Sequence, residues 1–259
     1  MSPFCSRARL LAGGALAVFA GAALATAAAA QKAPPDFSSN DVGWIAIGGD
    51  FAEIPGLGPA LMRNDPAHPY VVNGTGGQPS YRIADLSHPN LKPWVKERMK
   101  KDNDEVLAGK IGFTPRSSCW PAGVPTFMTY SRFQPIYFLQ TPKKVTMIFS
   151  GDMQVRQVYL DVPHSENPKP SWYGESVGHY EGDTLVIDTI GLNTKTYVDN
   201  YRTPHSEKLH VVERWRMADD RQSMEVTFTV EDPDTYYEPW SGTRRFRRAT
   251  QQFGEDVCA

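Results

Sequence analysis

The stretch Ser176-Val-Gly-His-Tyr-Glu-Gly-Asp-Thr-Leu-Val-Ile-Asp-Thr-Ile190 decides the fold class of this chain. Both of its halves contain the β-branched and aromatic residues that favour strands. Between them, Glu181-Gly182-Asp183 has the composition of a tight turn. The stretch therefore predicts an antiparallel β-hairpin.

The same two-residue period continues on both sides of this hairpin, from residue 134 to about residue 250. Two longer connections, 163–175 and 192–208, interrupt it. Consecutive strands bury a common face only by closing into a barrel or by packing as two sheets. We therefore expect an all-β, mainly antiparallel fold, an up-and-down barrel or half-barrel of about eight strands, with a sandwich as the second choice. The expected strands are residues 135–140, 145–149, 155–162, 176–180, 184–190, 209–217, 224–230 and 242–250.

The chain before residue 134 has a different pattern. Residues 31–80 are rich in Pro and Gly, which predicts an irregular segment that wraps the strands and holds one short strand at 44–47. Residues 91–110 carry apolar side chains at helical spacing and predict a helix, capped by Asn90 and stopped at Gly109. We expect a single β-rich domain over residues 31–259, with the wrapping segment and helix in 31–112 and the strands in 134–250.

The first thirty residues resemble a signal peptide. Arg7 and Arg9 precede an uncharged apolar run, and Ala28-Ala29-Ala30 forms an A-x-A cleavage pattern. We expect cleavage before Gln31 and a periplasmic or secreted protein; an uncleaved membrane anchor is the alternative.

Cleavage would leave Cys119 and Cys258 as the two cysteines of the mature chain. In an oxidising compartment two such cysteines favour a disulfide. The alternative is a buried Cys119 and a loose Cys258 near the end of the chain.

The composition excludes several functions. The 259 residues carry a formal charge of −2, so nothing in the charge favours nucleic acid or acidic lipid as a partner. The sequence has no G-x-G-x-x-G or Walker loop, and an H-E-x-x-H zinc motif is also absent. We expect no cofactor, no metal and no stable membrane insertion after cleavage; a zinc site formed by His164, His205 and His210 is the alternative, and the sequence predicts no oligomeric state.

Strand alternation places two carboxylates where they need partners. In residues 209–217, Glu213 shares a face with Val211 and Trp215, which predicts that it points inward. Asp188 lies between apolar residues and is a second candidate for an interior acid. A buried carboxylate requires a counter-ion or a raised pKa. Both a structural salt bridge and an acid–base pair fit this pattern; the available counter-ions are Arg156, Arg214, Arg244 and Arg245.

Four histidines lie between residues 164 and 210. Loops at the same end of an up-and-down barrel lie close together, so His164 and His205 are expected at one mouth. If the protein is an enzyme, the candidate catalytic residues are His205 or His210 as the general base and Glu213 or Asp188 as the acid or orienting group.

Aromatic side chains are dense in and beside the strands, which suits a pocket for a flat or sugar-like ligand, although core packing accounts for many of them. They are Trp172, Tyr173, Tyr180, Tyr197, Tyr201, Trp215, Tyr236, Tyr237 and Trp240. The candidate ligand-binding residues are His164, Trp172, Tyr173, His179, Tyr201, Arg214 and Trp215.

Two blocks of sequence resemble a bacterial family. They are Ser171-Trp-Tyr-Gly-Glu-Ser-Val-Gly-His-Tyr-Glu-Gly-Asp-Thr-Leu-Val-Ile-Asp-Thr189 and Pro204-His-Ser-Glu-Lys-Leu-His-Val-Val-Glu-Arg-Trp215. Ser118-Cys-Trp-Pro-Ala-Gly-Val-Pro125 and Glu231-Asp-Pro233 are similar to further segments of it. The resemblance is to uncharacterised secreted proteins, covers roughly residues 91–248, and implies no particular activity.

We therefore expect an exported small-molecule-binding β-barrel with an aromatic-lined pocket. One alternative is a cofactor-independent hydrolase or lyase that uses His and carboxylate acid–base chemistry on a small substrate. Another is a structural envelope protein, which would need neither a pocket nor converging histidines.

Overall fold

The computed structural model describes residues 34–38, 42–71, 82–130, 134–151 and 154–252. The predicted signal peptide, its predicted cleavage site and Cys258 lie outside these residues. Cleavage before Gln31 and the Cys119–Cys258 disulfide therefore stay predictions. Within the described ranges, no helix is both long enough and apolar enough to cross a membrane.

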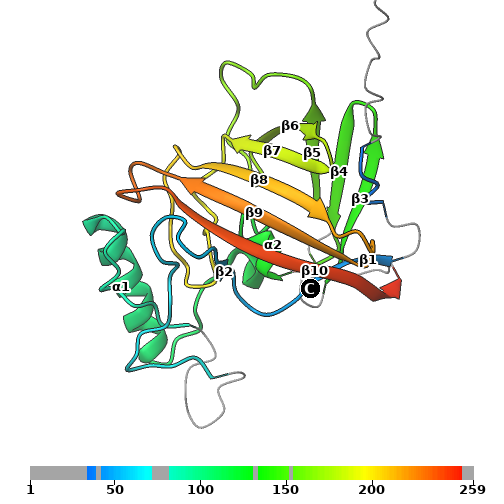
Figure 1. Ribbon diagram of the computed structural model, residues 1–259. Helices are drawn as coiled ribbons and strands as arrows, with labels where there is room; N and C mark the ends of the chain where they lie inside the picture. Colours follow the sequence, from blue (N-terminus) through cyan, green and yellow to red (C-terminus); the bar gives the residue numbers. More distant parts are fainter. Residues whose placement is uncertain (1–33, 39–41, 72–81, 131–133, 152–153, 253–259) are drawn as a thin grey trace, which may run out of the picture. The chain divides into compact units, whose positions relative to one another are not determined.

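The strands form one sheet that closes on itself, which confirms the all-β barrel (Figure 1). Nine strands make the barrel in the order β1-β3-β4-β5-β6-β7-β8-β9-β10, and β10 pairs again with β1 to close it. The additional strand β2 extends along β10. The strands are β1 (Val42–Ala46), β2 (Ala52–Glu53), β3 (Ile136–Thr141), β4 (Lys144–Phe149), β5 (Gln154–Leu160), β6 (Glu175–Glu181), β7 (Thr184–Ile190), β8 (His210–Met217), β9 (Ser223–Glu231) and β10 (Trp240–Gln252).

The barrel differs from the expected up-and-down arrangement at one pair. Strands β5 and β6 are parallel, with Val158 opposite Ser176 and Leu160 opposite Gly178. The connection over residues 161–174 allows this, because a parallel pair needs a crossover of about a dozen residues. All other paired strands are antiparallel, and each expected strand lies within two residues of the observed bounds.

The wrapping segment supplies one strand of the barrel itself. Its strand β1 lies between β3 and β10 and completes the hydrogen-bonded ring. Trp44 in this strand is fully buried, and its indole N–H donates to the backbone oxygen of Phe37 at 3.0 Å. The segment therefore closes the barrel that the sequence assigned to the later strands alone.

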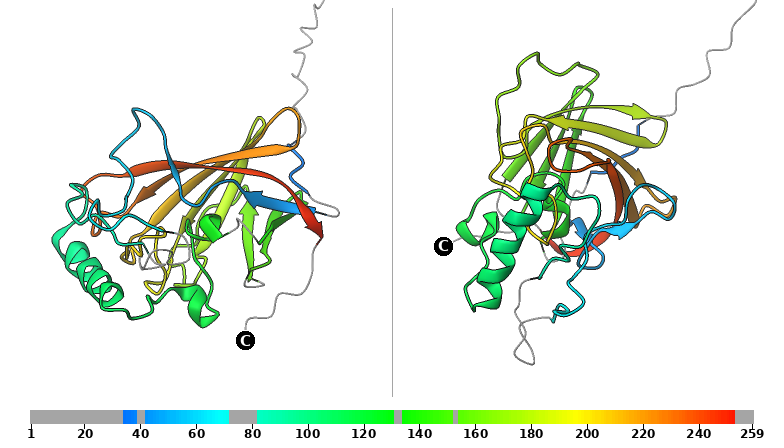
Figure 2. Two further views of the ribbon diagram at one scale, coloured as in Figure 1. Left: turned by 90° about the horizontal axis from the view of Figure 1, so that it is seen from below. Right: turned by 90° about the vertical axis from the view of Figure 1, so that its left-hand side faces the viewer.

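Aromatic rings pack together inside the barrel. Trp215 of β8 is fully buried, with ring centroids 5.5 Å from Phe138 and 5.3 Å from Phe246. Phe127 belongs to the short helix α2 (Phe127–Tyr130), which lies against the inner face of the curved sheet (Figure 2). The sequence did not predict this helix, because four residues are too few for a helical period to show.

The helix α1 (Pro93–Leu107) lies beside the connection between β9 and β10 (Figure 1). Its N-cap residue is Lys92, so the expectation of an Asn90 cap was wrong. The Asn90 side chain instead bonds both backbone groups of Glu238, with its amide donating to the oxygen at 2.9 Å and its oxygen accepting from the N–H at 2.9 Å. Asn90 thus ties the segment before α1 to the loop that leads into β10.

Candidate functional site

Glu213 points into the barrel, as its strand alternation predicts, and it is fully buried. The guanidinium of Arg156 pairs with both of its carboxylate oxygens, one at 3.1 Å. Arg156 also donates to the hydroxyls of Ser176 at 3.1 Å and Thr189 at 2.7 Å. The partners of the Arg156 guanidinium are thus the Glu213 carboxylate and two neutral hydroxyls. This geometry supports the structural salt bridge over an acid–base pair.

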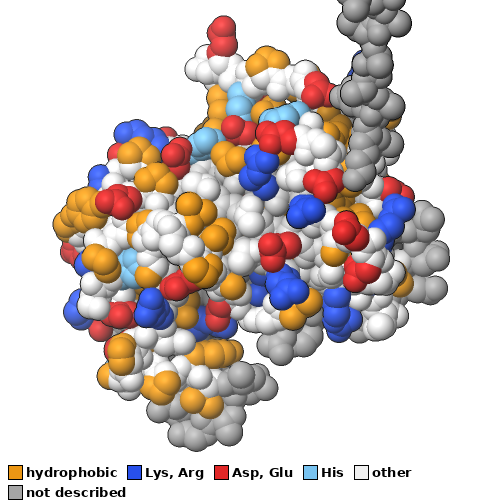
Figure 3. Space-filling model, viewed as in Figure 1, with side chains coloured by type: hydrophobic (Ala, Val, Ile, Leu, Met, Phe, Trp, Pro, Cys, Tyr) orange, Lys and Arg blue, Asp and Glu red, His pale blue; other side chains and the backbone are white. Residues whose placement is uncertain are grey.

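Asp188 lies on the outer face of β7, so the expectation of an interior acid was wrong here. Its Oδ1 is 3.0 Å from His164 Nε2 and 2.9 Å from His210 Nε2. The other ring nitrogens face further carboxylates, with His164 Nδ1 3.0 Å from Glu175 and His210 Nδ1 3.1 Å from Glu231. We call these five residues the outer histidine cluster. Figure 3 shows histidines among carboxylates in the upper part of this face.

The contacts of His210 favour its protonated ring. An imidazole whose two nitrogens both face carboxylates forms both hydrogen bonds only as an imidazolium, because the neutral ring has one N–H. The hydrogen bond to Asp188 accordingly raises the pKa of His210, with Glu231 adding to the rise against partial burial. The same contact lowers the pKa of Asp188. Since each ring nitrogen has a carboxylate, neither ring presents a free nitrogen to a substrate.

His205 has hydrogen-bond partners separate from those of His164, and the expectation that both lie at one mouth stays a prediction. The His205 ring is buried, with Nε2 2.8 Å from the Thr196 hydroxyl and Nδ1 2.9 Å from the Ser206 carbonyl. The carbonyl accepts only an N–H, so Nδ1 donates and Nε2 accepts from Thr196. Burial lowers the pKa of His205, which keeps the ring neutral.

The remaining predicted site residues do not form one cluster. His179 and Arg214 both bind the exposed Glu181 on the outer face, at 3.0 and 2.5 Å. Trp172 stacks near Trp120, with centroids 5.2 Å apart, and Tyr173 packs beside Phe127. In the described part of the chain, no group of three His, Cys, Asp or Glu side chains is placed to hold a metal ion.

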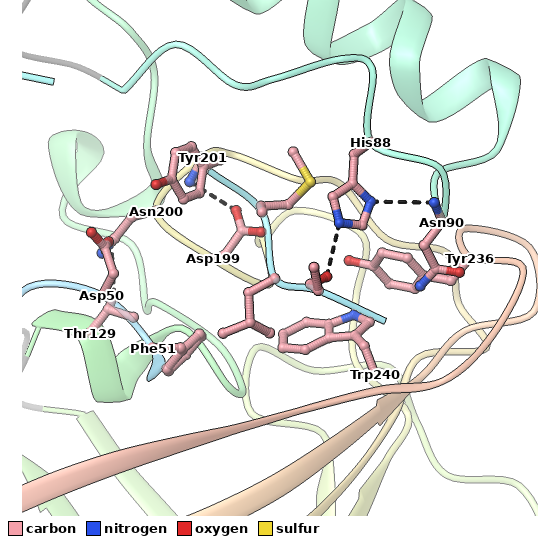
Figure 4. A pocket seen from close by; sticks show the side chains of 13 residues that line it. Asp50, Phe51, His88, Asn90, Thr129, Asp199, Asn200, Tyr201, Tyr236 and Trp240 are labelled. Atoms are coloured by element: carbon pink, nitrogen blue, oxygen red, sulfur yellow. Dashed lines mark hydrogen bonds between the residues drawn. The ribbon is translucent and has the colours of Figure 1, made fainter. Parts of the chain in front are cut away.

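A narrow cleft lies where three regions meet: the wrapping segment, the connection between β7 and β8, and the start of β10 (Figure 4). Its cavity is small, about 30 Å³, and it opens to solvent. Most of its exposed wall is apolar. Its aromatic side chains are Phe51, Tyr201, Tyr236 and Trp240, and its larger aliphatic ones are Leu61 and Met62.

Two polar groups in the cleft wall interact weakly with each other and have no hydrogen bond of standard geometry to any described residue. They are the hydroxyl of Tyr236 and the indole N–H of Trp240, and both atoms are buried. Figure 4 shows the Tyr236 ring directed into the cleft above Trp240. Burial raises the pKa of Tyr236 well above its usual value, so the hydroxyl keeps its proton. A buried hydroxyl with incomplete hydrogen bonding is uncommon in folded proteins.

The loop that carries Tyr236 is fixed from both sides. At the end of the loop, Asn90 hydrogen-bonds the backbone of Glu238. At its start, the Asp232 carboxylate accepts from the Thr235 hydroxyl. The Asp232 carboxylate accepts from the Ser206 N–H and hydroxyl at 2.6 and 2.7 Å, and from the Thr235 hydroxyl at 2.6 Å. Asp232 therefore joins the Tyr236 loop to the segment around Ser206, so the Tyr236 hydroxyl belongs to a well-anchored loop.

The charged groups of the cleft are all acidic. Asp199 is buried and accepts hydrogen bonds from the Tyr201 N–H at 2.8 Å and the Thr203 hydroxyl at 2.8 Å. Asp50 accepts from Arg82 at 2.9 Å. His88 donates from Nε2 to the Ala60 carbonyl at 2.8 Å, and burial lowers its pKa. No lysine or arginine is among the side chains that line the cleft.

Sequence reasoning selected only one residue of this cleft, Tyr201, as a ligand contact. Tyr236 and Trp240 stood out as part of the aromatic density, but their loop carries no motif that indicates a pocket. Asp50, Asp199 and Asn90 lie in turn-rich segments whose convergence depends on the three-dimensional fold. The density of aromatic residues was the one usable signal.

No known protein family matches this chain, and neither the characterised proteins nor the solved structures contain a match. The resemblance to secreted bacterial proteins therefore stays a prediction.

Proposed function

We propose that this protein binds a small, narrow, mostly apolar molecule in the cleft beside β10. The observation that carries the proposal is a cleft lined by aromatic rings, with a buried Tyr236 hydroxyl whose only partner among the described residues is a weak interaction with Trp240. Rings supply large contact area, and a single polar group orients the ligand, which is the usual composition of a small-molecule site. The predicted signal peptide adds export to this proposal.

The barrel interior is a less suitable place for a ligand. Trp215, Phe138 and Phe246 fill it by contacting one another, and the Arg156–Glu213 pair occupies its polar part. The outer histidine cluster is less suitable for acid–base catalysis, since its ring nitrogens already face carboxylates. These two observations favour binding in the cleft over hydrolysis or elimination at the histidines.

The test is a screen of small aromatic and aliphatic fragments by ligand-observed NMR, with three variants. Ala60→Leu adds bulk inside the cleft and should weaken binding at least about tenfold, while the matched Ala52→Leu in β2 should not change it. Tyr236→Phe removes the hydrogen bond between the Tyr236 hydroxyl and the ligand, so it should weaken the binding of fragments that carry a polar group about tenfold. Binding that survives Ala60→Leu, or a screen without any bound fragment, contradicts the proposal.

A further inference from the structure

The cleft combines aromatic rings with carboxylates and contains no positive side chain. Asp199 is the important carboxylate, because it is only 8% exposed and its hydrogen bonds come from neutral groups of its own loop. The second carboxylate, Asp50, already has Arg82 as a partner. The cleft therefore contains one buried carboxylate whose charge is not balanced by a side chain of the cleft wall.

We propose that the ligand of this cleft is an organic cation, an ammonium group on an apolar body. This inference rests on the proposed function and specifies the chemistry of its ligand. The ammonium group would lie near Asp199, and the apolar body would lie among Phe51, Tyr201 and Trp240.

Three properties of the wall select a cation over other ligands. An ammonium balances the charge of Asp199, which is buried and poorly solvated by water. Because the site is buried, the two charges interact more strongly than they would in water. The face of the Trp240 ring attracts cations, especially where water is excluded, whereas the Tyr201 ring already has the Arg82 guanidinium 5.9 Å from its centroid. The Tyr236 hydroxyl oxygen has a lone pair for an ammonium N–H, because the indole N–H of Trp240 engages only one of the two.

The same wall disfavours an anion. A carboxylate ligand would enter a cleft with Asp199 and Asp50 and find no lysine or arginine. His88 does not provide a positive charge either, because its Nδ1 accepts from the Asn90 N–H and burial lowers its pKa. A neutral ligand would fill the space but would leave Asp199 unbalanced.

The raised pKa of the Asp199 carboxyl also supports a cationic ligand. Burial raises the pKa of its carboxyl, against the lowering effect of the Thr203 hydroxyl. A raised pKa means that the folded protein without a ligand disfavours the ionised carboxylate. An ammonium beside Asp199 would remove that penalty.

The experiment compares three probes that share one ring and differ in charge: benzylammonium, benzyl alcohol and benzoate. Binding to the full protein is measured by NMR titration near neutral pH. Benzylammonium should bind at least about tenfold more tightly than benzyl alcohol, and benzoate more weakly than either. Asp199→Asn should remove the preference for the cation while benzyl alcohol binds as before.

Asp50→Asn provides a second variant if Asp199→Asn does not fold, and it should lower the preference for the cation by a smaller factor. Asp188→Asn removes a carboxylate of the outer histidine cluster and serves as the control that should change nothing. If benzyl alcohol or benzoate binds as tightly as benzylammonium, the cation inference is wrong and the proposed function stands. If none of the probes binds in a way that Ala60→Leu prevents, the proposed function itself is wrong.

Discussion

Glu213 and Asp188 lie on neighbouring strands and have opposite surroundings. In the pairing of β7 with β8, Ile187 is opposite Glu213 and Asp188 is opposite Val212. One step along the strand reverses the direction of a side chain, so Glu213 points into the barrel and Asp188 points outward. Each carboxylate has cationic or protonatable partners, and yet only Glu213 is closed off from water.

The difference shows that burial, and not the number of contacts, determines how much a charged group matters for stability. Asp188 contacts two histidines, but its side chain is 39% exposed, so water replaces much of what a substitution removes. Glu213 has one arginine, but water does not reach either partner. Removing one partner inside the barrel leaves a buried charge without compensation.

The largest effect is expected inside the barrel. Glu213→Gln leaves the Arg156 guanidinium buried without a carboxylate, so the free energy of unfolding should fall by about 3–5 kcal/mol. Urea denaturation of the wild type and the variant measures this change. A loss below about 1 kcal/mol would show that water reaches the pair and would remove the contrast with Asp188.

The double variant Arg156→Met with Glu213→Leu is the matched control. It removes both charges and keeps apolar volume, so it should recover most of the stability that Glu213→Gln loses. If the double variant is as unstable as the single one, lost packing accounts for the change, and the unpaired charge does not.

The pattern of residues predicted the strands because each carries a clear period. It did not predict that β5 and β6 run parallel, since alternation is the same in either direction. It also placed Glu213 correctly, because Val211 and Trp215 on the same face are apolar. It placed Asp188 wrongly because both faces of its strand carry apolar residues, so the period does not separate inside from outside.

The cleft was much less predictable than the barrel. Its walls come from segments more than a hundred residues apart, including Asp50, His88 and Tyr236. Irregular segments have no period that fixes which side chain faces a neighbour. The contacts that hold them, such as Asn90 with Glu238, become visible only in the folded chain.

Two histidines extend the comparison, because His205 is buried and His210 lies on the outer face. Burial lowers the pKa of His205 below its usual 6.5, so the folded state resists the proton that the unfolded chain accepts. Stability should therefore fall as the pH drops below about 6.5, by at most about 1.4 kcal/mol per pH unit. His205→Gln should flatten this slope.

Denaturation midpoints measured between about pH 8 and pH 5 provide the check. Thr196→Val is the control, because it removes the hydroxyl that donates to the ring but keeps the histidine. It should lower stability at every pH and keep the slope. Equal slopes for wild type and His205→Gln would mean that His205 accepts its proton in the folded state.

The smallest effect is expected in the outer histidine cluster, and its pH dependence has the opposite sign. The folded-state pKa of His210 is raised above 6.5, so its contribution to stability is complete below that pH and is lost as the pH rises through the raised value. The pKa of Asp188 is lowered below 3.8, so its contribution is complete above that pH and is lost only in stronger acid. Asp188→Asn should therefore cost about 1 kcal/mol near pH 5.5 and less near pH 8.5. An NMR titration should show the pKa of His210 falling in this variant, while Glu181→Gln, on the same face but outside the cluster, should leave it unchanged. A loss of stability in Asp188→Asn that grows with rising pH would mean that the rings bind Asp188 as neutral imidazoles. The difference between Glu213 and Asp188 would then depend on burial alone and not on protonation.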